Sequence, residues 1–155
     1  MSALPPTCTR RLQWCSGHRV MRHESKCAHL HGHNYVGYFT ATGSLDEVGR
    51  VIDFSVLKER IGGWIDVHWD HGLILHKDDD QMISALRHFR PLIRPDGVPI
   101  ATEQKLYLME NNPTAENMAA HLLREICPWA MEETGVTVTK VRIWETENCY
   151  ADAQG

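Results

Sequence analysis

Alternating apolar and polar positions predict two β-strands near the start of the chain. Residues 10–20 alternate, and one face of that strand carries Leu12, Trp14, Ser16 and His18. Residues 31–42 are rich in aromatic and β-branched side chains, which favour a second strand. The polar, basic stretch between the two strands, residues 19–30, predicts a loop.

Apolar residues at helical spacing predict a helix after the second strand. Leu57 and Ile61 fall on one face, and Asp53 just before them is a suitable N-cap. Two consecutive glycines, at positions 62 and 63, weaken the middle of this helix, so its length is left open.

A second helix is predicted to follow residues 112–114. Its apolar face carries Met118, Leu122 and Ile126. Pro128 ends or kinks this helix, because proline lacks the backbone N–H that the helix needs. Residues 136–144 then alternate with β-branched side chains and predict a final strand.

Residues 77–112, between the two helices, have the weakest pattern. Residues 81–89 are compatible with a helix, and residues 105–109 with a strand. A loop between them is predicted from Pro91, Pro95, Gly97 and Pro99. Strands that neighbour one another in sequence favour antiparallel pairing, so the whole order predicts an α+β fold with an insertion.

The composition is that of an ordinary globular protein, and 155 residues fit a single domain, residues 1–155. A net charge of −4 argues against nucleic acid or an anionic membrane as a partner. The apolar runs are too short to span a membrane, and residues 1–11 lack the apolar core of a secretory signal. We therefore expect a cytoplasmic protein.

Cysteine and histidine suggest the chemistry. The chain has five cysteines, an odd number with no Cys-x-x-Cys pair, so we expect reduced thiols rather than disulfides. Of its ten histidines, five fall within residues 18–33, and histidine is the commonest metal ligand. This local concentration points to a metal site.

His31 and His33 project from the same face of a strand because they are two residues apart. An antiparallel return brings His18, at the end of the preceding strand, close to them. Three imidazoles with a vacant fourth position describe a catalytic zinc site, and unrelated surface histidines are the alternative. The remaining histidines are expected at the surface: His23, His29, His68, His76, His88 and His121.

Cys27 has three possible roles. It could be a fourth metal ligand or a thiolate that acts as a base, since nearby cations lower the pKa of a thiol. Three such cations lie close in sequence: Arg19, Arg22 and Lys26. The third possibility is a buried, inert thiol, which is what we expect for Cys127 on the second helix.

Two further polar motifs are candidates. Asp70 next to His71 can raise the basicity of the imidazole, but only in a turn, which Gly72 permits. Glu145, at the end of the last predicted strand, could accept paired hydrogen bonds from a planar, amidine-like edge of a ligand. Surface positions without a role are the alternative for both motifs.

Together these residues resemble the 6-pyruvoyltetrahydropterin and 6-carboxytetrahydropterin synthase family. The matching motifs, in chain order, are His18, Cys27-x-x-x-His31-Gly32-His33, Gly49-x-x-Ile52-Asp53-Phe54-x-x-Leu57-Lys58, Asp70-His71, Pro113-Thr114-Ala115-Glu116-Asn117 and Glu145-Thr146. The gap of three residues between Cys27 and His31 resembles the carboxytetrahydropterin branch.

The resemblance implies a T-fold, in which an antiparallel four-stranded sheet carries two main helices on one face. In this family three sheets join into a barrel and two trimers form a homohexamer, with active sites between subunits. The resemblance also implies Zn²⁺ as cofactor, bound by His18, His31 and His33. The other implied roles are general base for Cys27, acid/base partners for Asp70 and His71, and pterin anchor for Glu145.

The implied reaction converts 7,8-dihydroneopterin triphosphate to 6-carboxy-5,6,7,8-tetrahydropterin, with loss of triphosphate and acetaldehyde. Its product is a precursor of queuosine and related deazaguanine bases. Arg19, Arg22 and Lys26 are candidates for contacts to the triphosphate. The alternatives are the pyruvoyl reaction on the same substrate and a non-catalytic zinc protein in which Cys27 closes the metal site.

The chain departs from the family pattern in three places. Cys15-Ser16-Gly17 stands where small alanines are usual, and Trp69 replaces a small aliphatic residue before Asp70. The stretch between His71 and Pro113 is longer than in compact members of the family, so we expect it to reshape a rim or an interface.

Overall fold

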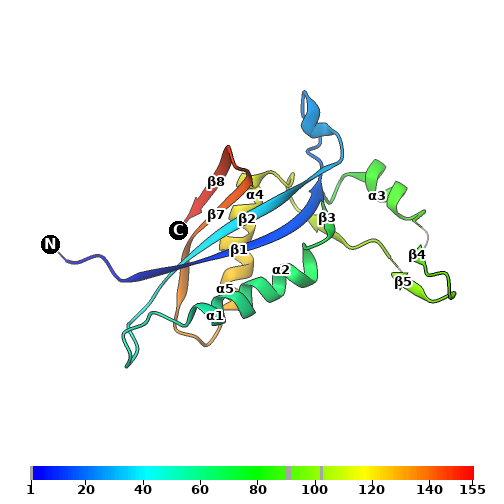
Figure 1. Ribbon diagram of the computed structural model, residues 1–155. Coiled ribbons are helices and arrows are strands. Elements are labelled where there is room, and N and C mark those ends of the chain that lie inside the picture. The colour runs from blue at the N-terminus through cyan, green and yellow to red at the C-terminus, as the bar shows by residue number, and fades with distance from the viewer. Residues whose placement is uncertain (1, 90–91, 102) are drawn as a thin grey trace.

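A six-stranded sheet organises the protein, seen in a computed structural model that describes residues 2–89, 92–101 and 103–155 (Figure 1). In chain order its strands are β1 (Thr7–His18), β2 (His31–Thr42), β3 (Gly72–His76), β6 (Leu106–Met109), β7 (Thr137–Thr146) and β8 (Cys149–Gln154). They lie side by side in the order β6-β3-β1-β2-β7-β8. The strands predicted for residues 10–20, 31–42, 105–109 and 136–144 are therefore confirmed as β1, β2, β6 and β7.

The expected α+β T-fold is present, but its strand count of four is too low. Strands β1, β2, β7 and β8 pair antiparallel, while β3 and β6 extend the sheet by parallel pairing beyond β1. Strand β3 was not predicted because its short apolar run does not alternate. Strand β8 was not predicted because it has no β-branched residues; it forms by pairing back on β7 through a two-residue turn.

Each predicted main helix is present as a run of three segments. The first run comprises α1 (Phe54–Leu57), the π-turn η2 (Lys58–Gly62) and α2 (Gly63–His68). The second comprises α4 (Ala115–His121), the π-turn η3 (Leu122–Ile126) and α5 (Cys127–Ala130). Asp53 caps the first as predicted, accepting a hydrogen bond from the Ser55 N–H at 2.8 Å. The second run ends at Ala130, two residues beyond Pro128.

Both helical runs lie on the same side of the sheet and form the core with it (Figure 1). The buried face of β1 carries the alternating residues that the sequence predicts, Leu12, Trp14, Ser16 and His18. Leu57, Ile61, Met118 and Leu122 on the helices are fully buried against it. Polar and half-buried side chains occupy the opposite face of the sheet, and no described helix covers them.

The inserted segment adds a helix and a hairpin. The helix α3 (Asp80–Leu86) agrees with the prediction for residues 81–89. Strands β4 (Leu92–Ile93) and β5 (Pro99–Ala101) pair antiparallel where a loop was expected, so that expectation is wrong in part. Pro91 lies outside the described residues. Figure 1 shows the hairpin extending away from the sheet.

Membrane-spanning helices are absent from the described ranges: none of their helices is long and apolar enough to cross a bilayer.

Candidate metal centre and active site

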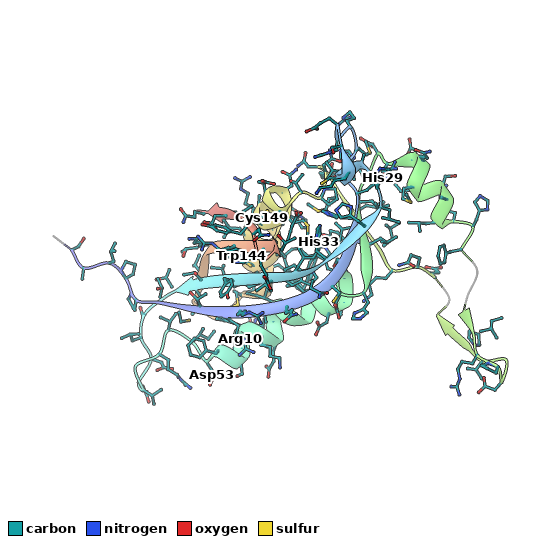
Figure 2. The ribbon with its side chains drawn as sticks, turned by 45° about the horizontal axis from the view of Figure 1, so that its top comes forward. Arg10, His29, His33, Asp53, Trp144 and Cys149 are labelled. Atoms are coloured by element: carbon teal, nitrogen blue, oxygen red, sulfur yellow. The ribbon has the colours of Figure 1, made fainter. Side chains whose placement is uncertain are left out.

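The three predicted metal-binding histidines meet at one end of the sheet. His18 and His31 are paired across β1 and β2, and their Nε2 atoms are 3.1 Å apart. One ring nitrogen from each of His18, His31 and His33 lies within 4.8 Å of the others. Figure 2 shows His33 near the middle of the molecule and away from Asp53. The antiparallel return of the chain therefore builds the cluster from local sequence features.

Two backbone carbonyls orient the imidazoles. His18 Nδ1 lies 2.7 Å from the carbonyl oxygen of Pro113, and His31 Nδ1 lies 2.7 Å from that of His29. A carbonyl can only accept, so each neutral ring carries its proton on Nδ1. The two Nε2 lone pairs then face one another at 3.1 Å, an arrangement that suits a cation bound by both.

Burial favours the neutral imidazole of His18 and of His33, which is the form that binds a metal. Burial, aided by the nearby His31 and His33, lowers the pKa of His18 to about 4 despite the hydrogen bond to Pro113. The pKa of His33 is lowered by burial and by His31, and its buried Nε2 has no described hydrogen-bond partner. Nitrogen ligands around a tetrahedral zinc ion lie about 3.3 Å apart. The spacing, the tautomers and the unpartnered nitrogen all fit zinc.

Glu145 lies beside the cluster, near the end of β7. Its Oε1 is 3.9 Å from His18 Nε2, and its Oε2 is 3.9 Å from His33 Nε2. Burial and the neighbouring Glu116 raise the pKa of Glu145, opposed by His31. Glu145 and His33 line one pocket of about 710 Å³. The carboxylate is thus placed to receive hydrogen bonds from a ligand that also reaches the histidines.

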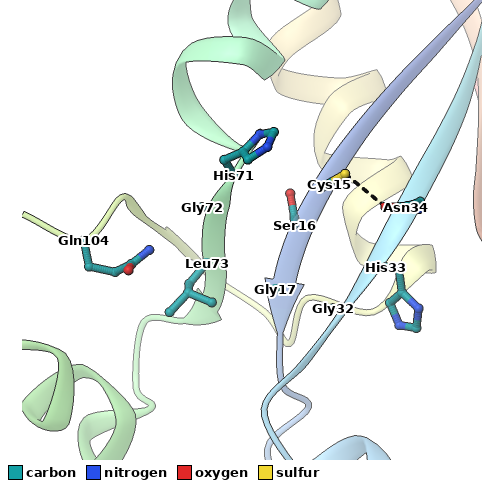
Figure 3. A pocket seen from close by; sticks show the side chains of 10 residues that line it. All are labelled: Cys15, Ser16, Gly17, Gly32, His33, Asn34, His71, Gly72, Leu73 and Gln104. Atoms are coloured by element: carbon teal, nitrogen blue, oxygen red, sulfur yellow. Dashed lines mark hydrogen bonds between the residues drawn. The ribbon is translucent and has the colours of Figure 1, made fainter. Parts of the chain in front are cut away.

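Asp70 and His71 contact one another in a turn, as their adjacency requires. His71 has a φ of 59°, and its Nδ1 lies 3.0 Å from Asp70 Oδ2. Although partial burial opposes it, hydrogen bonds from the Cys15 N–H and from His71 lower the pKa of Asp70. The His71 side chain is 79% exposed and lines, with His33, a pocket of about 460 Å³ (Figure 3).

Cys27 lies outside the histidine cluster. It belongs to the short 3-10 helix η1 (Lys26–Ala28) in the loop between β1 and β2, and its carbonyl accepts from the Val20 N–H at 2.9 Å. The compact group of possible metal ligands found among the described residues contains three histidines and no thiol. In this conformation Cys27 therefore does not close the site.

Arg19, a candidate for triphosphate contacts, is held by another partner. Its Nε and Nη2 each lie 2.6 Å from an oxygen of Asp79, whose side chain is 1% exposed. The other two candidates, Arg22 and Lys26, are exposed. The sequence could not show the ion pair because its members are 60 residues apart.

Two of the six histidines expected at the surface are not there. His76 is buried in β3, and the His121 side chain contacts the Tyr107 hydroxyl at 2.6 Å. The exposed positions of His29, His68 and His88 agree with expectation, and His23 is half-buried. Cys127 is buried as expected, which raises the pKa of its thiol to about 12. All five cysteines are free thiols.

The groups that support the histidine cluster were not predicted from the sequence. Pro113 and His29 act through backbone carbonyls, which leave no side-chain signal. Asn112 binds both backbone groups of Met21, in the loop that carries Cys27. In the sequence, the position of Asn112 directly before the Pro113 motif was the signal that could have pointed to a structural role.

Comparisons with known proteins agree with this geometry. The model of a family described as 6-pyruvoyl tetrahydropterin synthase matches residues 7–155. Two proteins named 6-carboxy-5,6,7,8-tetrahydropterin synthase, from Rickettsia bellii and Rickettsia typhi, are 40% and 41% identical to the chain; each alignment covers 94% of this chain and 97% of the relative.

Solved structures show the same fold. An uncharacterized protein from Wolinella succinogenes superposes with a TM-score of 0.79 at 24% identity, covering 99% of both chains. A 6-pyruvoyl tetrahydropterin synthase from Plasmodium falciparum superposes with a TM-score of 0.66 at 17% identity, covering 96% of this chain and 98% of that one.

Proposed function

The chain belongs to the 6-pyruvoyl tetrahydropterin synthase family, and on that premise we propose that it is a zinc-dependent 6-carboxy-5,6,7,8-tetrahydropterin synthase. Its substrate is 7,8-dihydroneopterin triphosphate, and triphosphate and acetaldehyde are lost in the reaction. The product supplies the synthesis of deazaguanine bases such as queuosine. A cytoplasmic location remains a prediction from the sequence.

The observation that carries this proposal is the carboxylate beside the metal-binding nitrogens. Glu145 lies 3.9 Å from both His18 and His33, so one small ligand can contact the carboxylate and the cluster together. A pterin ring presents adjacent N–H donors, which match the paired oxygens of a carboxylate. Its side chain carries oxygens that suit a metal bound by imidazoles.

Zinc held by His18, His31 and His33 would supply Lewis acidity toward the oxygens of the substrate side chain. Cys27 takes the proton that leaves carbon in this scheme. Asp70 fixes the tautomer of His71 through their 3.0 Å contact, and His71 then moves a second proton. The high exposure of His71 leaves its ring accessible, and we propose that it serves the site of a neighbouring subunit.

Two observations favour the carboxy product over the pyruvoyl product. Relatives at 40% and 41% identity, aligned over most of both chains, carry the name of the carboxy enzyme. The gap of three residues between Cys27 and His31 resembles that branch. The chemical difference is whether the side-chain carbons leave the pterin.

Product mass tests the proposal directly. The zinc-loaded protein is incubated with 7,8-dihydroneopterin triphosphate, and pterins and acetaldehyde are measured by mass spectrometry. We expect a pterin that carries a carboxylate, together with acetaldehyde in equal amount. A product that retains its side-chain carbons would establish the pyruvoyl reaction instead, and metal-stripped protein serves as the control.

A non-catalytic zinc protein is the second candidate, and it depends on Cys27 as a fourth ligand. X-ray absorption of the zinc-loaded protein distinguishes the two, because a Zn–S bond is about 0.2–0.3 Å longer than a Zn–N bond. We expect nitrogen and oxygen ligands without sulfur. A sulfur ligand combined with no turnover would favour the non-catalytic protein.

A further inference from the structure

The ion pair between Arg19 and Asp79 joins the loop of residues 19–30, which carries Cys27, to the inserted segment. Arg19 directly follows the metal-binding His18, and its two bonds to Asp79 are 2.6 Å each. The Asp79 side chain is 1% exposed, and that of Arg19 is 19% exposed. Paired charge-assisted hydrogen bonds of this kind are strong, and a buried carboxylate that loses its cation is costly. The Arg19 guanidinium is therefore held by Asp79 and is not free to bind another anion.

Asp79 is itself held rigidly on two sides. It is the N-cap of α3, where its Oδ1 accepts from the Met82 N–H at 3.3 Å. Its own N–H donates to the carbonyl of His76, the last residue of β3. The ion pair therefore anchors Arg19 to an element of the sheet and to the inserted helix.

The residues after Arg19 continue the anchoring toward Cys27. The Val20 N–H donates to the carbonyl of Cys27 at 2.9 Å. Met21 is bound through both backbone groups by the side chain of Asn112, at 2.9 and 3.0 Å. Asn112 precedes Pro113, whose carbonyl orients His18. One set of contacts thus determines the position of both the loop and a metal-binding imidazole.

We propose that Arg19 and Asp79 are positioning residues that hold the loop of residues 19–30 in the geometry Cys27 needs for proton transfer. This rests on the proposed function, in which Cys27 is the base. The start of the inserted segment then contributes to catalysis without contacting substrate, because it supplies Asp79. Arg19 is not a triphosphate ligand in this assignment.

Kinetics of Arg19→Gln and Asp79→Asn test the proposal. Asn is as good an N-cap as Asp, so Asp79→Asn removes the ion pair and keeps the cap of α3. We expect kcat to fall about tenfold or more in both variants with KM within about twofold, since misplaced groups lose rate. Lys77→Gln is the matched control: it removes an exposed ion pair, with Glu110 at 2.6 Å, from the same segment and should leave kcat unchanged.

A triphosphate role for Arg19 would give a different pattern. Arg19→Gln would then raise KM, while Asp79→Asn, which frees the guanidinium, would not. That pattern, or an unchanged kcat in both variants, would overturn the assignment. If either variant fails to fold, Arg19→Lys replaces it, and we expect a smaller fall in kcat because lysine keeps the charge but loses the paired geometry.

Amide hydrogen exchange gives a readout independent of activity. We expect the amides of residues 20–28 to exchange about tenfold faster in both variants and at the wild-type rate in Lys77→Gln. Unchanged exchange in this loop would overturn the proposal whatever the activity. If the wild-type protein does not turn over dihydroneopterin triphosphate, the proposed function fails, and the exchange experiment still decides whether the ion pair holds the loop.

Discussion

The direction of each imidazole decides what the three histidines can do. His18 and His31 donate from Nδ1 to backbone carbonyls, so both rings present Nε2 toward the cluster. Histidines at the same positions with the opposite tautomer would face one another with N–H groups and bind no metal. Histidine side chains alone therefore do not make the site; the carbonyls of Pro113 and His29 are also needed to orient the rings.

Replacing single residues should separate metal binding from proton transfer. We expect Cys27→Ala to keep zinc and lose turnover, because Cys27 is not in the cluster. His31→Ala should lose both, since it removes one of three ligands. Zinc content is measured by atomic emission next to initial rates. Loss of zinc from Cys27→Ala would contradict its role as base.

The metal-free protein should lose stability as the pH falls. The pKa of His18 is near 6.5 when unfolded and about 4 when folded, so the unfolded chain binds the proton first. The neutral His18 ring contributes roughly 3 kcal/mol to the free energy of unfolding. This contribution is fully present above pH 6.5 and is lost as the pH falls toward 4.

Urea denaturation of metal-stripped protein at several pH values checks this expectation. His18→Gln has no titrating ring at this position, and its stability should fall less between pH 6.5 and 4. Equal losses of unfolding free energy in the wild type and in His18→Gln would contradict the prediction.

At the scale of elements, the first helical run contains more glycine than its conformation requires. Gly63 has helical angles, φ −59° and ψ −42°, and a Cβ added there meets nothing within 4 Å. Its flexibility is thus a cost to the helix without a packing benefit in the single chain. Gly49 differs, because its φ of +88° is strained for any other residue.

Alanine substitutions at these glycines should therefore have opposite effects. We expect Gly63→Ala to raise the free energy of unfolding by about 0.5–1 kcal/mol, and Gly49→Ala to lower it by about 1 kcal/mol or more. Urea denaturation measures both. Destabilisation by Gly63→Ala would indicate that another surface packs against that position in the native assembly.

At the scale of the whole molecule, the uncovered sheet face and the two free sheet edges favour assembly. The edges of the described sheet are β6 and β8, and a sheet closed on itself with other copies has none. This supports the homohexamer that the family resemblance implies. We expect light scattering to give a mass of six chains.

Shared sites make a sharper prediction than the mass. If Cys27 and His71 of one active site come from different subunits, co-expressed Cys27→Ala and His71→Ala chains should restore activity. Random mixing places two intact residues in roughly a quarter of the sites, so about a quarter of the wild-type rate is expected. Each variant expressed alone is the control. No activity in the mixed oligomers would show that both residues come from one chain.

The parts of the fold and of the site that could be predicted from the sequence are those that depend on local periodicity. The histidine cluster follows from the spacing of His31 and His33 on a strand and from an antiparallel return to His18, and each feature is visible within sixteen residues. The cap of the first helical run and the apolar faces of both runs are equally local. Strand β3 was missed because its pairing with the distant strand β1, rather than an alternating pattern of its own, makes it a strand. Strand β8 was missed because it has no β-branched residues, although its pairing with β7 is local.

The sequence by itself determined the α+β architecture, the histidine cluster and the family, because these depend on side-chain type and short spacing. Tertiary structure alone decided that Arg19 forms an ion pair with Asp79, that Pro113 orients His18 and that His121 is half-buried against Tyr107. Each of those contacts joins elements distant in the chain or acts through a carbonyl. Such contacts form only when burial makes an unpaired polar group costly, so they become visible only once the chain is folded.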